Sequence, residues 1–192
     1  MARTSDSAMT SSHHPCDVMF AGWLATPLRV VINDPKRILR GLVHEGDTVV
    51  DLGCGPGFFS LPLARIAGET GRVIAVDVQE AMLSRLRRRA EKAGLASRIH
   101  AHLAEHDNIG VNEPADFILA FYMVHEVRDR DKLLRQVHHI LKPGGRFLLV
   151  EPIVHVPKRE YLRTVDATQA AGLVLVSKPH VRFSRAALFT RH

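Results

Sequence analysis

The sequence has few cysteines and no long apolar segment. Its two cysteines, Cys16 and Cys54, are too few and too far apart for a disulfide framework or a zinc site. The apolar runs fall far short of the roughly 20 residues that cross a bilayer. The N-terminus has no apolar block of the kind that a signal peptide needs. These absences predict a cytoplasmic protein with no membrane span.

Length and composition predict one compact domain. A chain of 192 residues leaves little room for a second core. Its 46% hydrophobic and 24% charged residues are close to the average for globular proteins, which argues against disorder and fibrous repeats. Residues 1–14 are polar and without periodicity, so we expect a disordered leader there. Residues 15–192 are expected to form the domain, with an N-terminal cap and helix in 15–45 and the core in 46–192.

The excess of basic residues is concentrated in two places. The net charge is +6, and residues 153–192 hold seven basic side chains against two acidic ones. A second cluster consists of Arg85, Arg87, Arg88 and Arg89. Such clusters are usually solvated surface, and the alternative is a patch that binds phosphates or another anionic partner such as RNA.

After Gly46 the chain alternates short apolar strands with longer amphipathic helices. The expected strands are residues 48–52, 72–77, 99–103, 115–122, 146–150, 173–177 and 186–190. The expected helices are residues 58–67, 79–93, 132–141 and 158–171, after a first helix that starts at Asp34 and Pro35 and buries Ile38, Leu39, Leu42 and Val43. This alternation predicts a doubly wound α/β domain, with a mostly parallel sheet and helices on both faces. No helix separates the last two strands, so we expect them to pair antiparallel at the edge.

A glycine-rich turn follows the first strand of this alternation. Gly53, Gly55 and Gly57 permit backbone angles that side chains forbid, and they let a ligand approach the main chain closely. The helix that follows offers unpaired N–H groups at its start. Asp77 ends the second strand twenty residues later, where an acid is placed to accept hydrogen bonds from both hydroxyls of a ribose. Strand, glycines, helix and acid together predict a pocket for a nucleoside-containing cofactor.

The residues of the turn favour S-adenosylmethionine over a dinucleotide. A dinucleotide-binding turn has the pattern G-x-G-x-x-G, whereas this turn has G-x-G-x-G, with Phe58 in the place of the third glycine. Asp51 adds a negative charge where a pyrophosphate would bind badly and an ammonium group would bind well. S-adenosylmethionine carries an ammonium, a sulfonium and a ribose, and it has no phosphate.

Four motifs together resemble the class I S-adenosylmethionine-dependent methyltransferases. They are VVDLGCGPG (49–57), VIAVDVQEAML (73–83), ADFILAFYMVHEV (115–127) and LKPGGRFLLVEP (141–152). The resemblance covers residues 34–192 and is greatest to the branch that includes quinone-biosynthesis and related small-molecule enzymes. It implies a seven-stranded sheet of order 3-2-1-4-5-7-6 with the seventh strand antiparallel.

The resemblance also implies a set of cofactor-binding residues. Asp51 and the glycines would hold the methionine part, Asp77 the ribose, and Val78 the adenine. The family often has Gly-Asp after the third strand, and this chain departs from it with Ala104 and Glu105. The full expected set is Asp51, Gly53, Cys54, Gly55, Gly57, Asp77, Val78, Glu105, His106, Ala120 and Phe121.

The acceptor side is expected at the end of the fourth strand. Tyr122 and Glu126 follow that strand, where the family's substrate loop begins, and His125 is the candidate general base because its pKa lies near neutrality. The alternative is that His125 and Glu126 cap or underlie the next helix. Phe20 and Trp23 lead us to expect that residues 15–33 fold over the site and line it.

The sequence predicts no metal site. His100 and His102 share one face of a strand, but no carboxylate or cysteine completes a familiar ligand spacing. The fourth strand also lacks the Asn-Pro-Pro-aromatic signature of enzymes that methylate base amino groups.

These observations predict transfer of a methyl group from S-adenosylmethionine to an unidentified small molecule, with S-adenosylhomocysteine as the product. One alternative is a methyltransferase that acts on RNA or ribosomal material through the basic C-terminal surface. Another is a non-catalytic subunit that binds S-adenosylmethionine, because fold and cofactor do not fix function. The expected partner is a small-molecule acceptor, and the chain is expected to be a monomer or a homodimer.

Overall fold

The computed structural model describes residues 33–106 and 108–192. The expected leader (1–14) and nearly all of the expected cap (15–33) lie outside these residues, as do Phe20 and Trp23. What was inferred about them stays a prediction.

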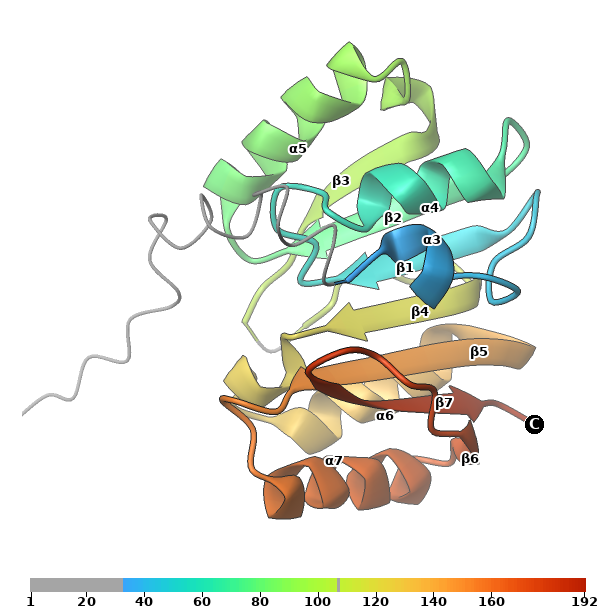
Figure 1. The fold of residues 1–192 in the computed structure, drawn as a ribbon. Helices are drawn as coiled ribbons and strands as arrows, with labels where there is room; N and C mark the ends of the chain where they lie inside the picture. Colours follow the sequence, from blue (N-terminus) through green and yellow to red (C-terminus); the bar gives the residue numbers. More distant parts are fainter. Residues whose placement is uncertain (1–32, 107) are drawn as a thin grey trace, which may run out of the picture.

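The described chain forms one sheet of seven strands in the order β3-β2-β1-β4-β5-β7-β6 (Figure 1). The strands are β1 (Thr48–Leu52), β2 (Arg72–Asp77), β3 (Ile99–Leu103), β4 (Ala115–Phe121), β5 (Leu141–Pro152), β6 (Val174–Ser177) and β7 (Ser184–Thr190). β1 to β5 are parallel to one another, and β7 is antiparallel to both β5 and β6. The fold expected from the sequence, including the antiparallel last strand, is confirmed.

Helices cover both faces of this sheet (Figure 1). They are α3 (Pro35–Ile38), α4 (Ser60–Ala67), α5 (Glu80–Lys92), α6 (Arg130–Ile140) and α7 (Lys158–Ala170), with short 3-10 turns η1 (Ala96–Arg98) and η2 (Val124–Glu126). Successive strand residues point to opposite faces, so the sheet contributes to two apolar cores. One core lies under α3, α4 and α5, and the other lies under α6 and α7.

Three helix boundaries differ by two residues or more from the sequence expectation, and one of them is the start of α4 at Ser60 instead of residue 58. α3 has only four residues, because Gly41 adopts a left-handed φ of 70° and turns the chain soon after Asp34 has capped the helix. Leu39 and Val43 are still buried, but they reach the core from a turn rather than from a helical stripe. α6 starts two residues earlier than expected, since the Asp129 side chain accepts a hydrogen bond from the Lys132 N–H and caps it there.

The topology brings several strand ends to one edge of the sheet. The strand order reverses direction between β1 and β4, which are hydrogen-bonded neighbours. Because the strands there are parallel, the carboxyl ends of β1, β2 and β4 share that edge. In open α/β sheets such a switch point is where ligands bind.

Candidate cofactor and acceptor site

A cavity of about 770 Å³ lies at this switch point. Its walls come from the glycine turn after β1, the end of β2 and the segments that follow β3 and β4. Of the residues that the sequence singled out, the structure places twelve in the wall: Asp51, Gly53, Cys54, Gly55, Asp77, Val78, Glu105, His106, Phe121, Tyr122, His125 and Glu126. One continuous site therefore contains most of the expected cofactor side and the described part of the acceptor side.

The glycine turn brings main chain to the cavity. Gly53 and Gly55 have φ values of 65° and 53°, which residues other than glycine rarely adopt. A Cβ added at Gly53 would lie 2.7 Å from the Met123 Cβ, whereas one added at Gly55 would meet nothing within 4 Å. The Cys54 N–H donates to the Val76 carbonyl at 3.0 Å, which ties the turn to β2. At Gly55, therefore, no side chain separates the main chain from the cavity, and a ligand could approach the backbone closely.

The Asp77 side chain, at the end of β2, is hydrogen-bonded to this turn. Its carboxylate accepts hydrogen bonds from the Gly55 N–H at 2.8 Å and the Gln79 N–H at 2.9 Å. The residue is only 9% exposed, and this burial raises the pKa of the carboxyl group while the two backbone hydrogen bonds oppose the rise. Asp77 both shapes the turn and presents carboxylate oxygens at the cavity wall.

Asp51 is the second buried acid in the wall, at 2% exposure. The hydroxyl of Ser60, the first residue of α4, donates to its Oδ2 at 2.6 Å. The neighbouring Cys54 thiol has a pKa raised well above its ordinary value, chiefly by burial and further by the charges of Asp51 and Asp77. Cys54 therefore stays a neutral thiol and acts as packing rather than as a nucleophile.

Two expected cofactor residues, Gly57 and Ala120, lie behind the wall rather than in it. A Cβ added at Gly57 would clash with side-chain carbons of Leu86 and Leu61, so this glycine lets α5 and α4 pack closely. Ala120 is completely buried in the core under α6. Neither residue is among those that line the cavity. The glycine motif and the end of β4 border the cavity, but the sequence pattern did not distinguish residues that line it from residues that pack behind it.

The wall of the cavity is strongly acidic. Among the described residues that line it are five carboxylates and one arginine, Arg128. The carboxylates belong to Asp51, Asp77, Glu105, Glu126 and Asp129. Such a wall favours a cationic ligand and opposes a pyrophosphate.

Aromatic rings form another part of the wall. Phe58, Phe59, Phe121 and Tyr122 contact one another in series, with centroid separations of 5.1, 4.4 and 4.3 Å. Tyr122 has a left-handed φ of 63°, a strained conformation for a residue with a side chain. Its hydroxyl shares a 2.5 Å hydrogen bond with the Ser184 hydroxyl at the start of β7, which holds the ring in place.

A histidine–glutamate pair lies beside these rings. The His125 Nδ1 is 2.6 Å from Glu151 Oε2, and the His125 backbone N–H donates to Glu151 Oε1 at 3.1 Å. Glu151 is 1% exposed at the end of β5. Glu151 was not among the site residues predicted from the sequence. Its position could have marked it, because Glu151 lies at the carboxyl end of a buried strand just as Asp51 and Asp77 do.

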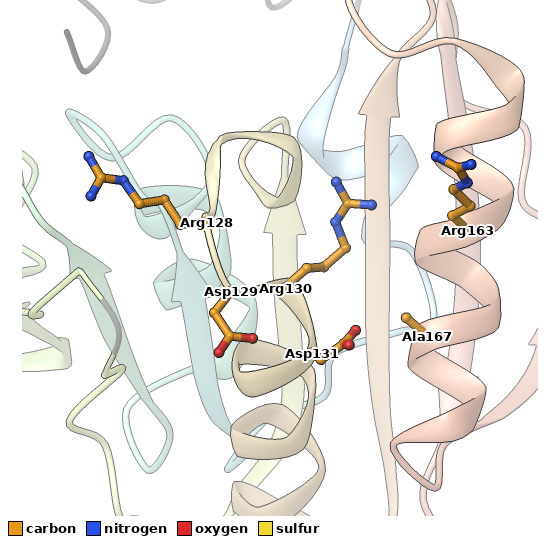
Figure 2. A pocket seen from close by; sticks show the side chains of 6 residues that line it. All are labelled: Arg128, Asp129, Arg130, Asp131, Arg163 and Ala167. Atoms are coloured by element: carbon orange, nitrogen blue, oxygen red, sulfur yellow. The ribbon is translucent and has the colours of Figure 1, made fainter. Parts of the chain in front are cut away.

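A second hollow, of about 590 Å³, lies between the start of α6 and α7 (Figure 2). It is lined by Arg128, Asp129, Arg130, Asp131, Arg163 and Ala167. Figure 2 shows Arg128 extending away from the other two arginines. Arg130 pairs with Glu160 of α7 at 2.9 Å. Acids thus offset the arginines of this hollow, which has neither the glycine turn nor the buried aspartates of the large cavity.

The histidines of β3 do not gather with other metal-binding side chains. The rings of His100 and His102 lie 6.5 Å apart. Within residues 33–106 and 108–192, no three His, Cys, Asp or Glu side chains are grouped so that they could hold a metal ion.

The chain matches a known protein family. A family model described as a methyltransferase domain matches residues 43–174. The chain belongs to this family. The motifs indicated a class I S-adenosylmethionine-dependent methyltransferase, and this prediction is confirmed, together with the cofactor that such enzymes use.

Individual relatives of this methyltransferase domain extend the comparison. The ubiquinone/menaquinone biosynthesis C-methyltransferase UbiE of Escherichia coli O1:K1 / APEC is 32% identical over 123 residues, which are 62% of this chain and 49% of that protein. The chain therefore spans about half the length of this curated relative.

Solved structures share the fold of this methyltransferase domain. A SAM-dependent methyltransferase from Aquifex aeolicus superposes with a TM-score of 0.83 at 24% identity, over 93% of this chain and all of that one. Fibrillarin from Aeropyrum pernix, solved with natively bound S-adenosyl-L-methionine, gives a TM-score of 0.67 at 18% identity, over 84% and 74% of the two chains. In the part of the methyltransferase domain that the structure describes, no helix is both long and apolar enough to cross a membrane.

Proposed function

We propose that this domain transfers a methyl group from S-adenosylmethionine to a small aromatic acceptor. The observation that carries the proposal is the cavity wall, where five carboxylates and one arginine surround bare backbone at Gly55. A cationic cofactor that approaches the main chain closely suits this wall, and a dinucleotide does not.

The residues of the cavity fit S-adenosylmethionine part by part. Asp77 presents a carboxylate for the two ribose hydroxyls, and Asp51 with the glycine turn suits the ammonium end. Val78 and Glu105 lie in the wall after β2 and β3, where the adenine would bind. When bound, the cofactor supplies a methyl group that its sulfonium already activates. The protein then has to align the acceptor and take up any proton that the acceptor loses.

The acceptor class follows from the aromatic part of the wall. Phe58, Phe59, Phe121 and Tyr122 line the cavity, and planar rings pack favourably against aromatic side chains. The printed name of UbiE, a C-methyltransferase of quinone biosynthesis, supports an acceptor with a flat ring. A cytoplasmic location and a monomeric or dimeric state also stay predictions.

Calorimetric titration tests the cofactor part of this proposal. We expect micromolar binding of S-adenosylmethionine and S-adenosylhomocysteine and no binding of NADH. A panel of acceptors, including a hydroquinone, a catechol and an aromatic amine, would then be screened with methyl-labelled S-adenosylmethionine. Binding of NADH alone would overturn the cofactor assignment. Cofactor binding without transfer to any acceptor would favour the non-catalytic subunit.

Residues 15–33 are proposed to close the acceptor side of the cavity, and the aromatic residues Phe20 and Trp23 in this segment motivate the proposal. Deleting residues 1–33 should weaken cofactor binding and slow transfer to an identified acceptor. Deleting residues 1–14 alone is the control and should change neither. Unchanged affinity and turnover after the longer deletion would contradict a closing role.

RNA is the second candidate acceptor, and the basic clusters motivate it. Several of their arginines have structural partners. Arg87 pairs with Glu80, Arg89 donates to the Pro56 carbonyl, and Arg185 and Arg191 donate to backbone carbonyls. These contacts weaken the case for a dedicated phosphate-binding surface. RNA affinity that falls steeply with salt would restore that case, and no binding at low salt would remove it.

A further inference from the structure

We propose that His125 and Glu151 form a dyad in which His125 Nε2 takes the proton that the acceptor loses on methylation, while Glu151 positions and orients the imidazole. This assignment rests on the proposed function and adds to it a class of acceptor: one whose reacting atom gives up a proton, either the oxygen of a hydroxyl group or an aromatic C–H carbon next to a hydroxylated one. His125 is the proposed catalytic residue, and Glu151 is a positioning residue.

The contact with Glu151 distinguishes the two ring nitrogens of His125. An ionised Glu151 would only accept hydrogen bonds, so in the proposed dyad Nδ1 carries the proton and donates it across the 2.6 Å contact. Nε2 is then the unprotonated ring nitrogen. His125 lines the large cavity, and one fifth of its side chain is exposed. A carboxylate behind one ring nitrogen fixes the tautomer and leaves the other as a base.

Glu151 is well suited to hold the ring in one orientation. Its two oxygens bond both the backbone N–H and the ring of His125, across 26 residues of sequence. It is almost completely buried at the end of β5, in register with Arg185 of β7. The ring therefore cannot turn without breaking a buried charge-assisted hydrogen bond.

Three acids face His125 from three different elements. Glu151 lies on β5, Glu126 on η2 with Oε1 4.0 Å from Nε2, and Glu160 on α7. Burial of the ring lowers the pKa of His125, but the hydrogen bond and charge of Glu151, with smaller contributions from Glu126 and Glu160, outweigh burial and raise it above its usual value. A stronger base results, and a positive charge arriving in the cavity would lower its pKa again.

The proton balance of the step is simple. The reacting atom of the acceptor exchanges its bond to hydrogen for a bond to methyl, and the sulfonium becomes a neutral thioether. The proton passes to Nε2, which gives an imidazolium paired with Glu151, and it then leaves to solvent. No oxidant, reductant or metal is required.

Nitrogen-detected NMR of the full chain with ¹⁵N-labelled histidine tests the dyad without any acceptor. The His125 signals are assigned by their loss in His125→Gln. In the wild type we expect the Nδ1–H tautomer above the titration midpoint. Glu151→Gln keeps the volume and an acceptor for the backbone N–H, but its amide donates to Nδ1, so we expect the opposite tautomer and a midpoint at lower pH.

Glu126→Gln is the matched control, since it removes a nearby charge on the Nε2 side without touching Nδ1. It should lower the midpoint but keep the Nδ1–H tautomer. An unchanged tautomer in Glu151→Gln would overturn the positioning role, because a residue that only packs beneath the loop would leave the ring nitrogens unaffected.

The wild-type protein then tests whether Nε2 faces the reacting position. S-adenosylhomocysteine has a neutral thioether, whereas sinefungin has an ammonium where S-adenosylmethionine carries its methyl group. We expect a lower His125 midpoint in the sinefungin complex than in the S-adenosylhomocysteine complex. Equal midpoints would overturn the base assignment. If neither ligand binds, the proposed function fails and the base assignment fails with it, while the tautomer result still stands for the dyad itself.

Discussion

Replacing Asp77 by alanine is expected to weaken S-adenosylmethionine binding by about 100-fold or more. Each hydrogen bond to a charged group contributes about 1.5–3 kcal/mol, and the proposed role gives Asp77 two of them to the ribose. The substitution also releases the Gly55 and Gln79 N–H groups, which shape the turn. Calorimetry at a temperature where the variant is folded measures the loss.

Two comparisons separate the ribose contact from the support of the turn. Asp116→Ala removes a carboxylate that also bonds a backbone N–H, that of Thr48, but Asp116 does not line the cavity. It should lower the melting temperature and leave affinity unchanged. Asp77→Asn keeps the volume and should fall between wild type and alanine. An Asp77→Ala variant with wild-type affinity would remove Asp77 from the cofactor site.

The same carboxylate gives affinity a pH dependence. Only the ionised form accepts from both hydroxyls, and burial raises the pKa of Asp77. Wild-type affinity should therefore begin to fall on acidification at a higher pH than for an ordinary aspartate. Asp77→Asn should lack that dependence.

Replacing Gly55 by alanine is expected to weaken the same binding by about 10- to 100-fold, because the new methyl group would occupy the space where the ligand meets the backbone. Holding alanine at a φ of 53° also costs about 1–2 kcal/mol of stability. Calorimetry and urea unfolding measure the two effects separately.

Gly94→Ala is the matched control for Gly55→Ala. Gly94 has a φ of 67°, and a Cβ added there also meets nothing within 4 Å, but it follows α5 and does not line the cavity. Both variants should lose similar stability, and only Gly55→Ala should lose affinity. Equal affinity in the two would show that the cofactor does not approach Gly55.

The sequence predicted the fold and the cofactor side of the site because their signals are local. Asp51 and Asp77 each lie at the carboxyl end of a buried strand, and the three glycines alternate with Cys54 and Pro56 directly after the first of these strands, so spacing alone placed these residues at one edge. Gly57 was harder, since its packing role depends on how closely Leu86 of α5 approaches.

Contacts between side chains that are far apart in the sequence could not be predicted from it. Glu151 and His125 are 26 residues apart, and Tyr122 and Ser184 are 62 apart. Each pair meets because β4, β5 and β7 lie side by side in the sheet. The sequence around each of these residues does not indicate which distant residue it contacts.

β1, which carries the cofactor turn, is also the best-protected strand of the sheet. All five of its residues are buried, and it is hydrogen-bonded to β2 on one side and β4 on the other. Amide hydrogens in such a strand exchange with solvent only when the domain unfolds as a whole. A ligand that binds only the folded state slows that exchange by the factor 1 + [L]/Kd. The amide exchange rates of β1 with and without the cofactor therefore give the Kd of the cofactor, and no acceptor needs to be known for this measurement.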